Sequence, residues 1–246
     1  MQSLQRGLSV IRSFDAEHDE LTLTEVATST GLTRATARRL LLTLVELGYV
    51  AFDGKRFSLT PQVLDIGYAY LSSLNIEQIA QPFLEALSER VNESVSVTVL
   101  DGSDIIYVAR VPTKRIMTIS LGLGSRLPAH CTSMGRVLLA ELPERRLREI
   151  VPLEFEPHTE HTIRTRTELE LELKRVRAQG WALVDQELEH GLRSIAAPLR
   201  DGSDTAVAAM NVSTHAGRTD VDAIHSHVLP ELLAAAASIS EALAKR

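Results

Sequence analysis

Residues 22–60, "TLTEVATSTGLTRATARRLLLTLVELGYVAFDGKRFSLT", decide the fold of the first part of the chain. Apolar residues at helical spacing predict two short helices here, separated by a turn at Gly31. We expect Thr24 to cap the first helix and Thr33 to cap the second, which ends at Gly48. Two short helices joined by a glycine-containing turn are typical of a helix-turn-helix, whose second helix enters the major groove of DNA.

The second of these helices carries polar residues in its N-terminal half, outside its apolar stripe. An arginine fork can hydrogen-bond to guanine and to phosphate alike, so arginines suit this position. Arginines on an exposed helix are more often only solvated surface, and they would not decide the matter alone. With the helix-turn-helix around them, the residues expected to contact DNA are Thr33, Arg34, Thr36, Arg38 and Arg39.

Residues 49–60 predict a β-hairpin around Asp53-Gly54, a turn sequence that is strongly favoured in hairpins. Lys55 and Arg56 lie at its tip, so the hairpin is expected to act as a wing that contacts backbone phosphate. Seven basic and seven acidic residues cancel within residues 1–60. The net charge of −6 therefore belongs to the rest of the chain and does not exclude a nucleic-acid partner.

The length of 246 residues favours two domains, and 44% hydrophobic residues suffice for a substantial core. No apolar run approaches the roughly 20 residues that span a bilayer, and the single cysteine cannot form an internal disulfide. We expect a cytoplasmic protein with no membrane partner. Its first domain covers residues 1–60, a linker helix covers 61–75, and a second domain covers 76–246. Apolar residues surround much of the linker, which predicts that it packs against a second copy of itself.

The second domain is predicted to be α+β. Alternating apolar residues in "SVSVTVLDGSDIIYVARV" (94–111) indicate a hairpin, and residues 115–121 are a candidate third strand. Helical segments follow, then further strands, then a final helix from Thr219 that Pro230 interrupts or kinks. Strands first, helices next and strands again favour a largely antiparallel sheet.

The stretch "LPAHCTSMGRVLLA" (127–140) places His130 beside Cys131. A cysteine nucleophile needs a base within hydrogen-bond reach, but adjacent residues of an extended segment point to opposite sides. Unpaired cysteines are usually buried and inert, so lining of the core or of a pocket is favoured over catalysis or a redox role.

Two histidine patterns and one row of carboxylates are candidates for further sites. "HTEH" (158–161) and "HSH" (225–227) lack the companions of a metal motif and are interpreted as solvated surface. Asp185, Glu187 and Glu189 alternate in "DQELEH", which would put them on one face of a strand as a possible acid/base row. Polar residues without an evident nucleophile suit a small-ligand pocket better, and these are Thr132, Ser133, Ser194, Asn211 and Ser213.

The chain resembles the IclR-type bacterial transcription regulators over essentially its whole length. The resemblance is carried by residues 22–60 and by "LPAHCTSMGRVLLA", "GWALVDQELEHGLRSIAAPL" and "AAMNVSTHAGR". The second and third of these motifs are similar to the subgroup that controls catabolism of aromatic acids through the β-ketoadipate pathway (PcaR-, PcaU-, PobR- and CatR-like regulators). Some family members have a cysteine where Ser194 stands here.

The resemblance implies a winged helix-turn-helix, a dimerising linker helix and a GAF-like effector domain, with dimers that often pair into tetramers. It also implies an organic acid effector such as β-ketoadipate, protocatechuate or 4-hydroxybenzoate, whose carboxylate the start of the helix after Thr132 could receive. Carried over residue by residue, the effector-binding positions are His130, Cys131, Thr132, Ser133, Asp185, Glu187, Ser194, Asn211 and Ser213.

The function expected is that of a homodimeric regulator, possibly a dimer of dimers, which binds double-stranded operator DNA and a small organic acid. It is not expected to be an enzyme or to carry a cofactor or metal. Two alternatives stay open at this point: a small-molecule hydrolase whose first domain mediates oligomerisation, and a redox sensor that uses Cys131.

Overall fold

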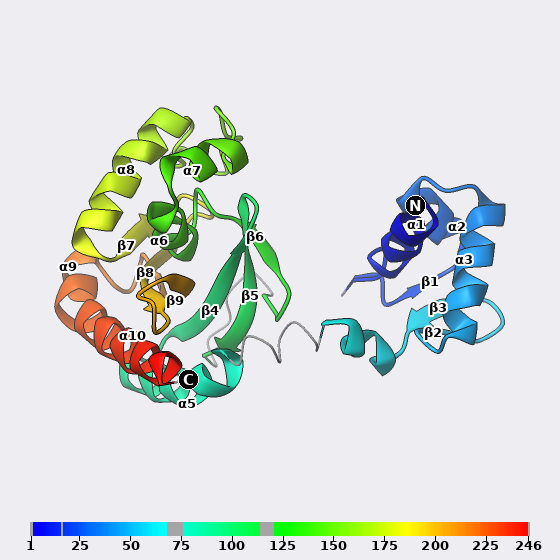
Figure 1. Ribbon diagram of the computed structural model, residues 1–246, viewed down its shortest axis with the longest axis horizontal. Helices are drawn as coiled ribbons and strands as arrows, with labels where there is room; N and C mark the ends of the chain where they lie inside the picture. The colour runs from blue at the N-terminus through cyan, green and yellow to red at the C-terminus, as the bar shows by residue number, and fades with distance from the viewer. Residues whose placement is uncertain (1, 16, 68–75, 114–120, 246) are drawn as a thin grey trace. The chain divides into compact units, whose positions relative to one another are not determined.

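The computed structural model describes residues 2–15, 17–67, 76–113 and 121–245. The chain divides into two compact units, residues 1–73 and residues 74–246, which Figure 1 shows in ribbon form. No helix among the described residues is long and apolar enough to cross a membrane.

The first unit is a winged helix-turn-helix, as expected. Helix α1 (Gln2–Ile11) precedes α2 (Leu23–Thr30) and α3 (Arg34–Glu46), and strands β2 (Val50–Phe52) and β3 (Phe57–Leu59) form the wing. A two-residue strand that the sequence analysis did not predict, β1 (Glu20–Leu21), pairs with β3, so the sheet order is β1-β3-β2. The three helices and the sheet enclose one apolar core, which includes Val10, Val26, Ala37, Leu41 and Phe57.

The cap of α2 differs from the prediction. Thr22, not Thr24, is the N-cap: its side chain accepts from Glu25 N, and Glu25 Oε2 accepts from Thr22 N at 2.7 Å. The threonine and the glutamate three residues later form a capping box, which satisfies two backbone donors at once and fixes the start of the helix there. Gly31 ends α2 with φ +65° and Thr33 caps α3, as predicted. Helix α3 ends at Glu46 with Leu47 as its C-cap, just before the predicted Gly48.

The predicted linker helix is described only in part. Residues Pro61–Val63 form a 3₁₀ turn and residues 64–67 are helical, whereas residues 68–75 lie outside the described residues. Leu64 and Ile66 expose 71% and 51% of their surface. That the linker dimerises stays a prediction.

The second unit is built on a six-stranded antiparallel sheet of order β6-β5-β4-β9-β8-β7. Its strands are β4 (Ser94–Asp101), β5 (Asp104–Val111), β6 (Arg126–Pro128), β7 (Ala182–Asp185), β8 (Leu192–Arg200) and β9 (Ala206–His215). The candidate strand at 115–121 lies almost wholly outside the described residues, and the next described strand after β5 is β6.

Helices cover both faces of this sheet (Figure 1). Helix α5 (Ile76–Val91) and α10 (Leu229–Ala244) pack against each other and against one face. Helix α6 (Ser133–Glu141) covers the other face and packs against α8 (Arg166–Gln179), with α7 (Glu144–Ile150) between them in sequence. The short α9 (Val221–Ala223) and a π-helical turn (Ile224–Val228) lead into α10, so the final helix is interrupted just before Pro230, as predicted.

The side chains of β8 alternate between the two faces. Ala196 packs with Ala182, Ala209 and the apolar residues of α6, while Ile195 and Leu199 point to the opposite face. Ser194, two residues before Ala196, therefore faces α6. This alternation decides which polar residues can meet beneath that helix.

Candidate DNA-binding surface and effector cavity

The arginines of α3 project from the unit's core. Ala37, Leu41 and Leu44 are the buried residues of the helix, and they turn it so that its first two turns present charge outward. Arg34, Arg38 and Arg39 are exposed, and their guanidinium groups make no hydrogen bond or ion pair with any other described residue. Arg34 and Arg38 are four residues apart, hence on one side of the helix. Their guanidinium groups are available to a DNA duplex.

The two threonines predicted to contact DNA are already engaged within the helix terminus. Thr33 Oγ1 accepts from Thr36 N at 3.3 Å and donates to Thr36 Oγ1 at 3.0 Å. Thr33 is exposed and Thr36 half-buried. Capping is the role that the contacts of Thr33 support, and its contact with DNA stays a prediction.

The wing carries two cations, Lys55 and Arg56, and of these only the Arg56 side chain has a hydrogen bond to another described residue. Asp53 Oδ1 accepts from the backbone N–H groups of Lys55 and Arg56, both at 2.7 Å, which shapes the turn together with Gly54 at φ +101°. The Lys55 side chain is exposed. Arg56 Nη1 donates to Glu20 O at 3.1 Å, so this arginine ties the wing to β1. Lys55 is therefore the better placed of the two to contact phosphate.

A cavity lies between the sheet and the start of α6 in the second unit. It holds about 560 Å³ not filled by protein atoms, part of it open to solvent. Its walls are mostly apolar, as in most small-molecule sites. The lining residues come from β5, from β6 and the segments on either side of it, from the start of α6, and from strands β7 to β9 with the turn between β7 and β8. The apolar ones are Tyr107, Leu121, Leu127, Met134, Val184, Leu188 and Leu192.

Five of the predicted polar residues meet in this cavity, where Thr132, Ser133, Ser194, Asn211 and Ser213 all contribute to its lining. Ser133 Oγ and Ser194 Oγ are 2.9 Å apart, which joins the first turn of α6 to β8. Asn211 Nδ2 donates to Ser213 Oγ at 3.0 Å. Asn211 Oδ1 is buried without a hydrogen-bond partner among the described residues. A buried acceptor without a hydrogen bond lowers the stability of the folded protein, so a hydrogen-bond donor on a ligand would bind favourably to Asn211 Oδ1.

Cys131 also lines the cavity and is buried. Burial raises the pKa of its thiol to about 12. Because the thiolate is the nucleophile, a thiol in this state is a poor catalyst. The preference for a lining role over catalysis is in keeping with this environment.

Sequence reasoning missed the cation of the cavity. Arg110, on β5, is half-buried in its wall, and its guanidinium makes no hydrogen bond or ion pair with any other described residue. The signal was available, since Arg110 interrupts the otherwise apolar "IIYVARV" of a strand that had been predicted. Tyr107 lies on the same strand, and burial raises the pKa of its phenol to about 12, so it stays neutral.

Three predicted effector residues do not line this cavity. Asp185 is on the face opposite Val184, where its Oδ2 accepts from Arg193 Nη2 at 2.8 Å. His130 borders a second cavity, of about 720 Å³, partly open to solvent, and its ring stacks on Phe155 with centroids 4.1 Å apart. Burial lowers the pKa of His130 to about 4, so its imidazole is neutral near pH 7.

Glu187 is the third, and its position corrects the predicted row of carboxylates. β7 ends at Asp185, and Gln186 adopts φ +59°, which breaks the alternation of a strand. Glu187 is thereby turned under α6, where its Oε2 accepts from Arg136 Nη2 and from Ile163 N. Arg136 Nε also donates to His130 O at 2.9 Å. This buried pair shapes the segment before α6 instead of contacting the cavity.

A winged helix-turn-helix with exposed arginines, joined in one chain to a domain whose mostly apolar cavity carries a few polar groups, defines the class of ligand-responsive DNA-binding regulators. Residues 3–54 match the IclR helix-turn-helix domain, and residues 68–241 match the bacterial transcriptional regulator IclR C-terminal domain. The chain belongs to the IclR family of bacterial transcription regulators. It is therefore a DNA-binding regulator and not an enzyme, which rules out the hydrolase alternative.

Two individual relatives resemble the chain over nearly its full length, and a third resembles two thirds of it. It is 44% identical to the Pca regulon regulatory protein of Pseudomonas putida, over 99% of this chain and 84% of that one. A crystal structure of a Rhodococcus sp. RHA1 protein, described as a transcriptional regulator, is 55% identical with a TM-score of 0.88 and covers 99% of this chain and 98% of that one. The inducer-binding domain of a PobR double mutant from Acinetobacter, in complex with 3-hydroxybenzoic acid, is 30% identical with a TM-score of 0.62, over 67% of this chain and 97% of that one.

Proposed function

We propose that the chain controls transcription in response to a small aromatic carboxylic acid that binds in the cavity beneath α6. One observation carries this proposal. Arg110, whose side chain has no partner among the described residues, lines the same mostly apolar cavity as the hydroxyl and amide groups of Ser133, Ser194 and Asn211. Arg110 would receive the carboxylate, and the polar groups on β8 and β9 would receive a ring hydroxyl.

The lining favours an aromatic monocarboxylate, such as 4-hydroxybenzoate or protocatechuate, over the dicarboxylate β-ketoadipate. Arg110 is the one cationic side chain among the described lining residues, and a second buried carboxylate would lack a partner of opposite charge. The apolar walls match the faces of a benzene ring. The PobR domain holds 3-hydroxybenzoic acid, which supports the same class of effector for this chain.

Calorimetric titration of the full-length protein with 4-hydroxybenzoate, protocatechuate and β-ketoadipate tests this assignment. Arg110→Gln should weaken binding of every aromatic acid by at least about tenfold, since a charge-assisted hydrogen bond contributes about 1.5–3 kcal/mol. Ser194→Ala should weaken only the acids that carry a ring hydroxyl, relative to benzoate. Arg90→Gln, which removes an exposed arginine paired with Glu231, is the matched control and should bind as the native protein does. Tight binding of β-ketoadipate alone would overturn the proposal.

We also propose that the regulator acts as a homodimer through residues 61–75, with one winged helix on each half of a two-fold operator. The exposed Leu64 and Ile66 support this proposal, because apolar residues on a connector gain from mutual burial. The effector would then act by favouring one arrangement of the two DNA-binding units over another, which requires unequal affinity for the two arrangements. Leu64→Glu should shift the mass measured by light scattering toward the monomer, and an unchanged mass would count against the linker as the interface.

A further inference from the structure

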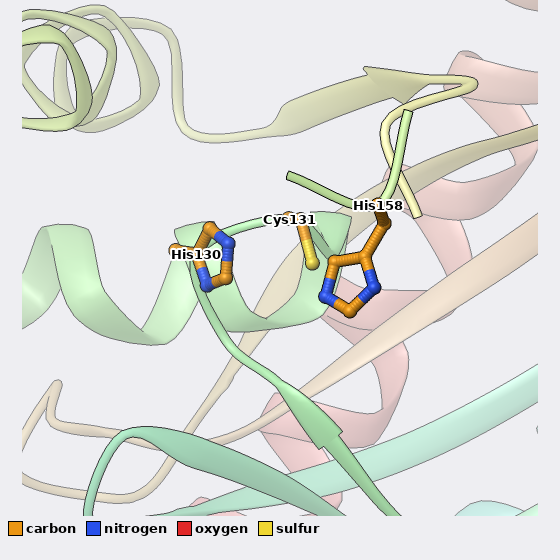
Figure 2. A group of neighbouring side chains, drawn as sticks. All are labelled: His130, Cys131 and His158. Atoms are coloured by element: carbon orange, nitrogen blue, oxygen red, sulfur yellow. The ribbon is translucent and has the colours of Figure 1, made fainter. Parts of the chain in front are cut away.

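Three side chains with metal-ligating atoms gather beside the cavity. His130 and Cys131 precede α6, and His158 comes from the loop between α7 and α8. One nitrogen of each imidazole and the Cys131 sulfur all lie within 4.8 Å of one another. Figure 2 shows the sulfur between the two imidazole rings. The long gap in sequence between Cys131 and His158 explains why no motif marked the group.

None of the three ligand groups is committed to a strong contact elsewhere. His130 Nε2 is buried without a hydrogen-bond partner among the described residues. The Cys131 thiol makes only a weak contact with Pro128 O, at 3.8 Å. The imidazole of His158 is exposed and makes no hydrogen bond to another described residue, and its ring centroid lies 6.3 Å from that of His130. A neutral imidazole with a free ring nitrogen is the form that binds a metal.

We propose that His130, Cys131 and His158 form a binding site for Zn²⁺. Zinc takes a mixed set of imidazole and thiolate ligands, with Zn–N of about 2.0 Å and Zn–S of about 2.3 Å, which puts tetrahedral ligand atoms about 3.5 Å apart. The present separations, all within 4.8 Å, would shorten to about 3.5 Å on binding. As the Zn–S bond forms, the Cys131 S–H bond breaks and its proton passes to solvent.

The surroundings suit a cation with three protein ligands. The nearby guanidinium of Arg136 is already paired with Glu187, which limits its repulsion of a bound cation. Three ligands leave a fourth position open for water or an exogenous ligand. Because Cys131 also lines the cavity beneath α6, a bound ion would lie at the edge of that cavity and fix the segment that leads into the helix.

Spectroscopic titration of the chelator-treated, desalted full-length protein with Co²⁺, followed by displacement with Zn²⁺, tests the site. We expect one equivalent of Co²⁺ to give sulfur-to-cobalt charge-transfer absorption, which stoichiometric Zn²⁺ abolishes and excess Mg²⁺ does not, because Mg²⁺ prefers oxygen ligands. His158→Ala should weaken Zn²⁺ binding by at least about tenfold, measured against a chromophoric chelator. The substitution is on an exposed side chain, so the variant should still fold.

His161→Ala is the matched control, since His161 is an exposed histidine on the same loop that is not in the ligand group. It should bind Zn²⁺ as the native protein does. Cys131→Ser should remove the charge-transfer absorption wherever circular dichroism shows that the variant is folded. Three results would each overturn the site: native protein that gives no charge-transfer absorption, His158→Ala that binds as tightly as native protein, or equal losses in His158→Ala and His161→Ala.

Discussion

Arg136 Nη2 and Glu187 Oε2 form a buried ion pair that joins α6 to the turn after β7. The side chain of Arg136 is 3% exposed and that of Glu187 is 10% exposed. Each residue also bonds to the backbone of a neighbouring segment: Arg136 Nε donates to His130 O, and Glu187 Oε2 accepts from Ile163 N. The pair therefore fixes the segment that leads into α6, where Thr132 and the first residue of the helix, Ser133, line the cavity.

Glu187→Gln should lower the free energy of unfolding by about 3–5 kcal/mol, because it leaves the Arg136 charge buried without an opposite charge. Urea unfolding followed by circular dichroism measures the loss. The double variant Arg136→Met, Glu187→Met should lose less stability than the summed losses of the single variants Arg136→Met and Glu187→Met. In the double variant neither charge remains buried alone. Strictly additive losses would mean that the pair is not coupled.

Gly135→Ala should destabilise the second unit by about 1–3 kcal/mol, the usual cost of overpacking. A Cβ at position 135 would overlap the backbone of Ala129, so α6 can approach the preceding segment only with a glycine there. The comparison is Gly122→Ala, where the added carbon meets nothing within 4 Å. Thermal unfolding of both variants checks this, and equal melting temperatures would contradict the close approach.

Much of the fold was predictable because its signals are local. The apolar periods of α2, α3 and the β4–β5 hairpin, and the Asp53-Gly54 turn, need only neighbouring residues to be interpreted. Thr22 was missed as a cap although the local pattern Thr-x-x-Glu was present. Strand β1 was missed because two residues carry no period, and it exists only through its pairing with β3.

The cavity was predictable in part. Ser194 and Ser213 are direct neighbours across β8 and β9, and strand alternation turns both side chains toward α6. This alternation can be predicted from the sequence. Glu187 was wrongly predicted to lie on the same strand face as Asp185. The alternation of side chains stops at Gln186, and nothing in the sequence indicates the positive φ of that residue. Arg110 was not predicted, although it is the one charged residue in the apolar run "IIYVARV", and such a residue in a strand that borders a cavity can contact a ligand.

Cys131 in the metal-free protein should react slowly with a thiol reagent near neutral pH and rapidly after unfolding. Burial raises the pKa of its thiol to about 12, so little thiolate is present, and the buried sulfur is poorly accessible. The rate of reaction with Ellman's reagent, with and without denaturant, measures this. A fast reaction of the native protein would favour the redox-sensor alternative. The same alternative would be favoured by a Cys131→Ser variant that folds and binds the aromatic acid but no longer releases DNA in response to it.

Lys55→Ala should weaken DNA binding to a similar extent for every sequence. Lys55 is exposed at the tip of the wing, where it is expected to contact phosphate, and phosphate contacts carry no sequence information. The slope of log affinity against log salt concentration should fall by about 1. Fluorescence anisotropy over a salt series measures the slope, and an unchanged slope would remove the wing from the interface.

Arg38→Ala should weaken binding to the preferred DNA sequence by about 1–3 kcal/mol if the guanidinium is bidentate to a base, and should relax selectivity at that position. The physical basis is that Arg38 is exposed on the same side of α3 as Arg34, with no hydrogen bond or ion pair to another described residue, so no internal contact has to break before it binds DNA. The duplex is best obtained by letting the protein select from random sequence, and gel-shift titration then gives the affinities. Arg145→Ala, on α7 of the other unit, removes an arginine that is 92% exposed and should leave binding unchanged. Native affinity in both Arg34→Ala and Arg38→Ala would show that α3 does not read the sequence.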